Sequence, residues 1–238
     1  MEDRLRNEVA AVVPCYNSGG RLRPVLKELC EHVQHVIVVD DGSTDDIAKD
    51  LEGMPVTLKT FPVNRGKGHA LIEGMRVART INGVTCIVTL DSDGQHDPKE
   101  IPRLYQTFCE KKADFIIGSR VFEKREKVPL RSRFGNKLTI VLAGLLLGKR
   151  LPDTQSGYRL HSARFVDHIL KTVSVGRYET EMEILIRAVR DDGFVVLPVP
   201  IQTIYEGRNT SSHFSSTRDS FLIYRKLLKM TLGRREKP

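Results

Sequence analysis

Short apolar runs alternate with helical stretches through the first half of this chain. The runs predicted as strands are Val9–Val13, His35–Val39, Val56–Phe61, Cys86–Leu90 and Asp114–Ile117. Helical patterns lie between them, near Gly20–His32, Thr44–Leu51, Gly66–Thr80 and Pro98–Lys111. Because the strands are apolar without clean alternation, we expect them to be covered on both faces. Repeated strand–helix units predict an α/β fold with an open, mostly parallel sheet flanked by helices.

The pattern loosens beyond Arg120. Helices are expected at Ser132–Leu147, Tyr178–Arg190 and Thr217–Leu232, and strand-like runs at Phe194–Val199 and Ile201–Tyr205. At 238 residues the chain is long enough for one domain with a sizeable core. We therefore expect one domain over residues 1–212. Residues 213–238 are expected to form a basic amphipathic helix that belongs to the same domain or faces a membrane.

Composition and cysteine usage are those of a soluble intracellular protein. Hydrophobic residues make up 40% and charged residues 29% of the chain, as in ordinary globular proteins. The four cysteines form no CxxC pair, which suits a reducing compartment and supports neither a zinc site nor a disulfide framework. The first residues lack the apolar stretch of a signal peptide, and no run of about 18 apolar residues occurs. We expect a cytoplasmic protein.

The net charge of +8 is concentrated in two segments. Residues 120–150 hold nine Lys and Arg against two Glu, and residues 225–238 hold six against one. The rest of the chain is therefore acidic, with a net charge of −4. Such basic segments attract anionic partners, namely phosphorylated substrates, anionic membranes or nucleic acid. Nucleic acid is disfavoured because the segments lack interleaved aromatic residues for base stacking.

Two features indicate contact with a membrane surface. Leu138–Gly148 is almost wholly apolar between basic residues, and it is too short to span a bilayer. It fits either a buried core helix or an interfacial helix with basic anchors. The last predicted helix places Arg218, Arg225 and Lys229 on one stripe, which suits a membrane surface or a solvated helix. Together they predict peripheral contact with the cytoplasmic face of a membrane.

Polar or glycine-rich clusters follow all five predicted strands of the first half. The clusters are Pro14–Asn17, Asp40–Asp45, Asn64–Gly68, Asp91–His96 and Gly118–Arg120. In an open parallel sheet, ligands bind outside the carboxyl ends of the strands. Any one cluster fits a turn with a helix cap. Because five such clusters follow five strands, we predict that they line one binding cleft.

The cluster after the fourth strand carries the clearest chemistry. Asp91 and Asp93 stand at i and i+2 of an extended strand end, so their carboxylates point to the same side. A hard divalent cation between them would relieve their repulsion, together with waters and substrate phosphates as further ligands. Such an ion neutralises charge on a diphosphate leaving group. A DxD triplet alone is a weak signal, but Asp-Xaa-Asp-Gly-Xaa-His after a buried strand is more specific.

Two other clusters suit a nucleotide. In the cluster after the second strand, Ser43 or Thr44 is expected to cap the next helix, which leaves Asp40 or Asp41 to accept hydrogen bonds from a base or ribose. Gly66 and Gly68 let the backbone approach a ligand and open a helix whose N-terminus favours anions. Their spacing fits neither a Walker loop nor the dinucleotide fingerprint.

Taken in order, these motifs resemble the family 2 glycosyltransferases, and within them the branch of dolichyl- and polyprenyl-phosphate sugar transferases. The likeness rests on VPCYN at 13–17, DDGSTD at 40–45, DSDGQH at 91–96, GSR at 118–120 and DTQSGYR at 153–159. It covers residues 8–212. The resemblance implies a GT-A fold, which is Rossmann-like, an inverting reaction, Mg²⁺ or Mn²⁺ as the cofactor, and a GDP- or UDP-linked sugar as donor.

The resemblance also assigns roles to individual residues. Contacts to the nucleotide fall on Pro14, Tyr16, Asp41, Gly66 and Lys67. The metal and diphosphate positions are Asp91, Asp93 and Gln95, and the acceptor phosphate falls to Arg120, Arg133 and Arg208. The expected catalytic set is thus Asp91, Asp93, Arg120 and Arg133. Two departures are that Ser18 stands where many relatives carry an acidic residue, and that many relatives continue into transmembrane helices.

Three functions remain open at this point. With a polyprenyl phosphate acceptor, the phosphate oxygen is itself the nucleophile, so catalysis is mainly electrostatic and positional. With a saccharide hydroxyl, a general base is required, for which Asp153, Glu179, Glu181 and Glu183 are candidates. The third alternative is a non-catalytic domain that binds nucleotide sugars.

Overall fold

The computed structural model describes residues 2–18, 20–120, 140, 144, 153–190, 193–202, 204 and 218–232. The strands are β1 (Val9–Cys15), β2 (His35–Asp40), β3 (Val56–Thr60), β4 (Cys86–Thr89), β5 (Phe115–Arg120), β6 (Arg159–Ser162) and β7 (Val196–Ile201). The α-helices are α1 (Glu2–Glu8), α2 (Leu22–His32), α3 (Ile47–Leu51), α4 (Lys67–Ala78), α5 (Ile101–Lys111), α7 (Ala163–Thr172), α8 (Glu179–Arg190) and α9 (Arg218–Leu232), and η1 (Pro98–Glu100) is a 3₁₀ turn.

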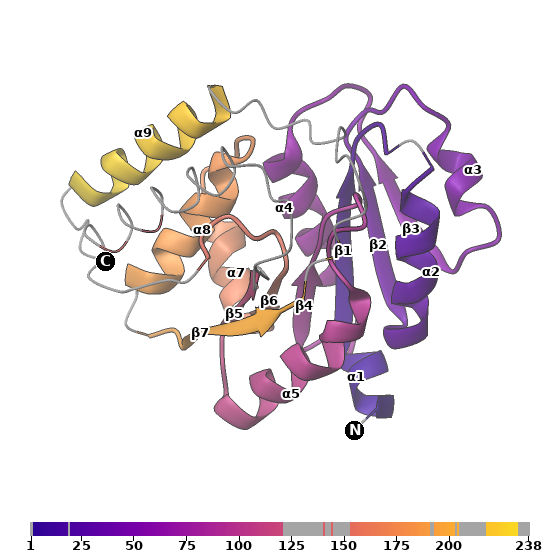
Figure 1. Ribbon diagram of the computed structural model, residues 1–238, viewed down its shortest axis with the longest axis horizontal. Coiled ribbons are helices and arrows are strands. Elements are labelled where there is room, and N and C mark those ends of the chain that lie inside the picture. Colours follow the sequence, from indigo (N-terminus) through magenta and orange to yellow (C-terminus); the bar gives the residue numbers. More distant parts are fainter. Residues whose placement is uncertain are drawn as a thin grey trace.

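The strands form one twisted sheet with the order β3-β2-β1-β4-β6-β5-β7 within the described residues (Figure 1). The pairs β1–β2, β1–β4, β2–β3 and β5–β7 are parallel, whereas β6 runs antiparallel to both β4 and β5. The open, mostly parallel sheet expected from the strand–helix repeats is confirmed. All five strands expected in the first half are present, and their ends differ from the expected ones by at most three residues.

Helices cover both faces of the sheet, which explains why its central strands are apolar throughout. Successive residues of a strand point to opposite faces. In β1, Val9, Ala11 and Val13 pack with α1, α2 and α5, whereas Ala10 and Val12 pack with α4, α7 and α8. Figure 1 shows α4, α7 and α8 on one side of the sheet, with α9 outside α8. Two hydrophobic cores result, and the sheet separates them.

The strand expected at Ile201–Tyr205 is wrong. β7 ends at Ile201, and the described residues Gln202 and Ile204 lie outside any strand. Their backbone amides are used elsewhere, because Gln202 N donates to Glu100 Oε1 (3.1 Å) and Ile204 N donates to Gln95 O (3.0 Å). The chain after β7 is therefore drawn across the turn that follows β4 instead of continuing the ladder.

Three elements were not expected from the sequence, namely α1, β6 and α7. Of the four residues in β6 only Leu160 is aliphatic, yet all four are buried because the strand lies between β4 and β5. Ser162 then caps α7, since its Oγ accepts the hydrogen bond of Phe165 N at 3.0 Å. The serine cap and the apolar spacing Phe165, Val166, Ile169 are the pattern that predicts this helix.

The C-terminal helix α9 packs against α8. The expected domain bounds and the alternative placements of residues 213–238 stay predictions. Ile223 is buried in the core that α4, α7 and α8 share, and Lys226 forms an ion pair with Glu183 of α8. The segment Leu138–Gly148 and most of the helix expected at Ser132–Leu147 lie outside the described residues. Within the part that is described, no helix has both the length and the apolar character to cross a membrane.

Candidate active site

The loops after β1 and β2 are bonded to each other at the carboxyl edge of the sheet. Asn17 has a positive φ of 48°, its backbone N donates to Ser43 Oγ (2.9 Å), and its Oδ1 accepts from Thr44 N (2.8 Å). The expectation that Ser43 or Thr44 caps α3 is therefore wrong, because both residues are engaged with Asn17. The N-cap of α3 is Asp46, which makes no side-chain capping bond.

Asp41 connects the loop after β2 to the loop before α4. Its carboxylate is 3% exposed and accepts hydrogen bonds from Arg65 N (2.7 Å) and Gly66 N (2.8 Å). Gly66 adopts a φ of +100°, which favours glycine, and an added Cβ would meet the Arg177 side chain at 2.6 Å. Asp41 thus shapes the Gly66–Gly68 loop, and its direct contact with a nucleotide stays a prediction.

Two more residues assigned to the nucleotide, Pro14 and Tyr16, lie at this edge. Pro14 is buried within β1, opposite Val39 of β2, and Tyr16 is partly exposed just after the strand. Both lie at the carboxyl end of the central strand, as the sequence predicts. Their contacts with a ligand stay predictions.

The turn after β4 is closed by its own side chains. Asp91 N donates to His96 Nδ1 (3.2 Å), and Gln95 N donates to Asp93 Oδ1 (3.0 Å). Burial lowers the pKa of His96 to about 4, so the imidazole is neutral near pH 7 and its Nδ1 acts as an acceptor. Gln95 O also accepts the hydrogen bond of Ile204 N, which ties the turn to the chain after β7. The three residues predicted to hold a metal therefore lie in one constrained turn.

The two aspartates of this turn differ in their ionisation. Burial raises the pKa of Asp91, but the nearby positive charge of Lys67 outweighs burial and lowers it to about 2. Burial and the negative charge of Asp91 raise the pKa of Asp93 to about 6. The surrounding cations therefore compensate Asp91 and leave Asp93 undercompensated. A divalent cation beside both carboxylates would supply the missing charge.

Lys67, which the sequence assigns to the nucleotide, lies between two carboxylates. Its ammonium is 2.6 Å from Asp91 Oδ1 and 2.9 Å from Glu181 Oε2. Burial by itself lowers the pKa of Lys67, yet the two carboxylates raise it above its ordinary value. Sequence reasoning missed this role of Glu181, because the residue lies far along the chain on α8.

The donor set of the turn fits Mg²⁺ or Mn²⁺. No group of three or more His, Cys, Asp and Glu side chains is arranged as a metal cluster within the described residues. Mg²⁺ needs no such cluster, since one or two carboxylates, waters and substrate phosphates suffice. Asp91 and Asp93 supply hard oxygen ligands, and the raised pKa of Asp93 indicates a local need for positive charge. Gln95 adds an amide oxygen in the same turn.

Arg120 ends β5 and is held by Asp153. Its Nε and Nη2 donate to the two carboxylate oxygens of Asp153 at 2.7 and 3.1 Å. Asp153 is 1% exposed and also accepts from the backbone N of Gln155 and Ser156. Although burial raises its pKa, Arg120 lowers it below the ordinary value. Arg120 also lowers the pKa of Asp91, so its positive charge acts on the turn after β4.

Arg133 and Arg208, the other two arginines assigned to the acceptor, lie outside the described residues.

Gly157 and Arg159 contribute to the site although sequence reasoning gave them no role of their own. A Cβ on Gly157 would stand 2.8 and 2.9 Å from the carboxylate oxygens of Asp91, so only glycine leaves room for that side chain. Arg159 is buried and donates to Ser156 O (2.8 Å) and Glu181 O (2.7 Å). It thereby joins the Asp153–Gly157 segment to the start of α8. Both residues belong to the DTQSGYR motif, which was the available signal.

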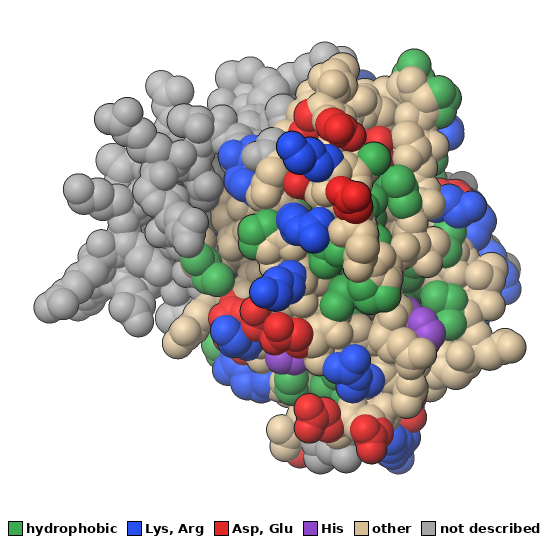
Figure 2. Space-filling view, turned by 90° about the vertical axis from the view of Figure 1, so that its right-hand side faces the viewer, with side chains coloured by type: hydrophobic (Ala, Val, Ile, Leu, Met, Phe, Trp, Pro, Cys, Tyr) green, Lys and Arg blue, Asp and Glu red, His purple; other side chains and the backbone are tan. Residues whose placement is uncertain are grey.

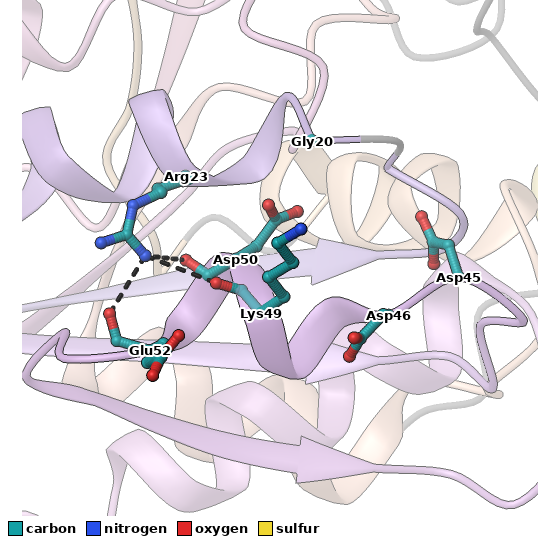
Figure 3. A pocket seen from close by; sticks show the side chains of 7 residues that line it. All are labelled: Gly20, Arg23, Asp45, Asp46, Lys49, Asp50 and Glu52. Atoms are coloured by element: carbon teal, nitrogen blue, oxygen red, sulfur yellow. Dashed lines mark hydrogen bonds between the residues drawn. The ribbon is translucent and has the colours of Figure 1, made fainter.

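A surface pocket of about 540 Å³ lies apart from this turn, beside α2 and α3. Its lining is mostly charged: Gly20, Arg23, Asp45, Asp46, Lys49, Asp50 and Glu52 (Figure 3). Arg23 Nη1 donates to the backbone oxygens of Asp50 (3.1 Å) and Glu52 (3.0 Å), so it anchors the end of α3. Figure 2 shows that basic and acidic side chains are interspersed over the face of the molecule that carries these helices. The pocket contains none of the predicted site residues.

Comparison with known proteins supports the resemblance. The family model of glycosyl transferase family 2 matches residues 10–170. The chain is 30% identical over 254 residues to the UDP-N-acetylglucosamine–dolichyl-phosphate N-acetylglucosaminyltransferase of Methanococcus voltae, covering 98% of this chain and 99% of that protein. It is 29% identical over 204 residues to the polyprenol monophosphomannose synthase of Mycolicibacterium smegmatis, covering 80% of this chain and 75% of that protein.

A solved structure of similar fold is glucosyl-3-phosphoglycerate synthase of Mycobacterium tuberculosis in complex with Mn²⁺, uridine diphosphate and glucosyl-3-phosphoglycerate. It superposes with a TM-score of 0.70 at 17% identity, covering 96% of this chain and 81% of that chain. At this identity the likeness shows the fold alone, and the expected GT-A type is confirmed. The matching family model and the near-complete coverage of the Methanococcus relative settle the identity of the family. The chain belongs to glycosyltransferase family 2.

Proposed function

We propose that this protein transfers a sugar from a nucleoside-diphosphate sugar to a polyprenyl phosphate, with inversion at the sugar and with Mg²⁺ or Mn²⁺ as cofactor. The observation that carries the proposal is the geometry of Asp91 and Asp93, whose carboxylates lie with Gln95 in one constrained turn at the carboxyl edge of the sheet. A bound cation supplies charge neutralisation for the donor diphosphate. Asp91, Asp93 and Gln95 would hold it.

The residues around the pair fit the two anionic substrates. The Gly66–Gly68 loop, shaped by Asp41, opens α4 and favours a phosphate at the helix N-terminus. Arg120 is fixed in orientation by Asp153 and adds positive charge on the other side of the turn. We assign the acceptor phosphate to Arg120 together with Arg133 and Arg208.

The reaction needs little acid–base chemistry from the protein. An oxygen of the acceptor phosphate, already ionised near pH 7, forms a bond to the anomeric carbon of the sugar. The bond from that carbon to the donor diphosphate breaks on the opposite face, and the nucleoside diphosphate leaves with the electron pair. The residues therefore act by bringing two anions together and by orienting them.

A saccharide hydroxyl is a less suitable acceptor because three of the four candidate bases, all but Glu179, are engaged in ion pairs. Asp153 is bonded to Arg120, and Glu183 is buried and bonded to Arg187 and Lys226. Glu181 is bonded to Lys67. A general base must accept a proton near pH 7, whereas the ion pairs lower the pKa of Asp153 and Glu183.

Two finer assignments complete the proposal. The name of the Methanococcus relative and the uridine diphosphate in a structure of similar fold support a UDP-linked donor ahead of a GDP-linked one. A polyprenyl phosphate resides in a membrane, so we place the enzyme peripherally on the cytoplasmic face, with α9 and the basic segment at 120–150 as its contacts. No role with nucleic acid is proposed.

The test is product formation from short polyprenyl phosphates. The purified protein is incubated with UDP- and GDP-sugars, Mn²⁺ and a short polyprenyl phosphate, and mass spectrometry reports the lipid-linked sugar. The matched control acceptor is the polyprenol without its phosphate, for which we expect no product, and chelation of the metal should stop the reaction. Nuclear magnetic resonance of the product reports the anomeric configuration. Glycosylation of saccharide hydroxyls alone would refute the proposal.

A further inference from the structure

The ammonium of Lys67 stands where it competes with a metal for Asp91. It contacts Asp91 Oδ1 at 2.6 Å and Glu181 Oε2 at 2.9 Å, so one cation is shared between two carboxylates. The three side chains are 13 to 31% exposed, which makes these contacts stronger than those of ion pairs in open solvent. A cation that binds Asp91 must therefore displace or repel the Lys67 ammonium.

Glu181 is held in place independently of Lys67. It stands in the first turn of α8, and its backbone oxygen accepts a hydrogen bond from Arg159 Nη1 at 2.7 Å. Arg159 is itself buried and bonded to Ser156 O and Thr154 O. The backbone of Glu181 is therefore tied to a buried arginine, and its carboxylate reaches Lys67 from that position.

Asp91 has little freedom to move away from the lysine. Gly157 packs directly against the Asp91 carboxylate. The backbone N of Asp91 donates a hydrogen bond to His96 Nδ1. If Asp91 is to bind a divalent cation, it is the flexible lysine that must yield. Lys67 yields more readily when a second carboxylate already shares its charge.

We propose that Glu181 is a positioning residue that draws the Lys67 ammonium toward α8 and so keeps Asp91 available to a divalent cation. This inference rests on the metal site of the proposed function. It predicts that Glu181 affects metal binding only through Lys67. A simple effect of the negative charge of Glu181 would act whether or not the lysine is present.

The experiment is a double-mutant cycle on Mn²⁺ affinity, measured by electron paramagnetic resonance of free Mn²⁺ without donor or acceptor. Glu181→Gln should weaken binding about tenfold, because Lys67 then pairs with Asp91 alone. Lys67→Met should strengthen binding about tenfold, since Asp91 loses its competing cation. In the Lys67→Met background, adding Glu181→Gln should change the affinity less than about twofold.

The controls separate this inference from the metal site itself. Glu73→Gln removes a carboxylate from the same helix as Lys67, where it pairs with Arg76, and should leave Mn²⁺ affinity unchanged. Asp93→Asn should weaken binding strongly; if it does not, the metal site and the inference both fall. If Asp93→Asn weakens binding and Glu181→Gln has equal effects with and without Lys67, or none at all, only the inference is overturned. Should Glu181→Gln not fold, Lys67→Met decides, because weaker Mn²⁺ binding in that variant overturns the inference.

Discussion

The loops that follow β1 and β2 and the segment from Asp153 to α8 build the same site in different ways. In the first region, side chains hold the backbone, as Asn17 and Asp41 do through short hydrogen bonds to neighbouring loops. In the second region, carboxylates determine how the positive charges of the site are paired. Asp153 pairs with Arg120, and Glu181 pairs with Lys67. The first region thus fixes the shape of the loops at the site, and the second decides which charged groups of the site are compensated.

The largest effect that the comparison predicts is on turnover. Asp93→Asn removes the undercompensated carboxylate of the turn after β4, and we expect kcat to fall about 10³-fold, equivalent to about 4 kcal/mol. The matched control is Asp97→Asn in the same turn region, because Asp97 caps η1 and asparagine caps equally well. Steady-state kinetics at saturating donor measure both variants. A loss of less than tenfold for Asp93→Asn would remove the metal from the mechanism.

The next effect is on stability and compares the Arg120–Asp153 ion pair with the Lys67–Asp91 ion pair. Asp153 is 1% exposed, whereas the Asp91 side chain is 31% exposed. Arg120→Met should therefore cost about 3 kcal/mol of unfolding free energy, because it leaves a buried charge without its partner. Lys67→Met should cost about 1 kcal/mol. Urea unfolding measures both, and equal costs would contradict the structural role given to the Asp153 pair.

A third effect is on the pH dependence of stability in the presence of a chelator. The folded-state pKa of Asp93, about 6, lies above its ordinary value of 3.8, so the folded protein binds this proton more tightly than the unfolded chain. Stability relative to Asp93→Asn should then fall by about 2 kcal/mol as the pH rises from about 4 to above 6. Saturating Mn²⁺ should restore the loss at pH 7.5. A difference between the two proteins that does not vary with pH would show that Asp93 is compensated without metal.

The smallest effect concerns the contact between Gly157 and Asp91. Gly157→Ala places a methyl group within 3 Å of both carboxylate oxygens, so we expect a loss of about 1–2 kcal/mol in stability together with weaker Mn²⁺ binding. Gly53→Ala is the control, because Gly53 has a positive φ of 72° but open space around it. That variant should lose a similar stability from backbone strain alone and bind Mn²⁺ normally. Identical metal binding in both alanine variants would mean that Asp91 tolerates displacement.

Local patterns were sufficient for much of the fold and for the position of the site. The strands of the first half, the polar clusters at their carboxyl ends and the Asp91–Asp93 pair all follow from short stretches of sequence. A strand buried between two layers must be apolar, and a loop at the ligand edge carries polar residues and glycine, so both leave local signals. β6 has no local sequence signal, because its burial comes from its neighbours β4 and β5. The strand expected at Ile201–Tyr205 does not continue past Ile201, because the amide of Ile204 bonds to the turn after β4.

The ionisation of the site was decided by tertiary structure. Lys67, Asp91 and Glu181 are far apart in the chain, and no local pattern indicates that one ammonium is shared between these two carboxylates. The same holds for Arg120 and Asp153, which lie on either side of a long connection. The type of a residue and its neighbours in sequence determine which chemistry is present. Its charge state depends on burial and on partners within a few ångströms, and those distances exist only once the chain has folded.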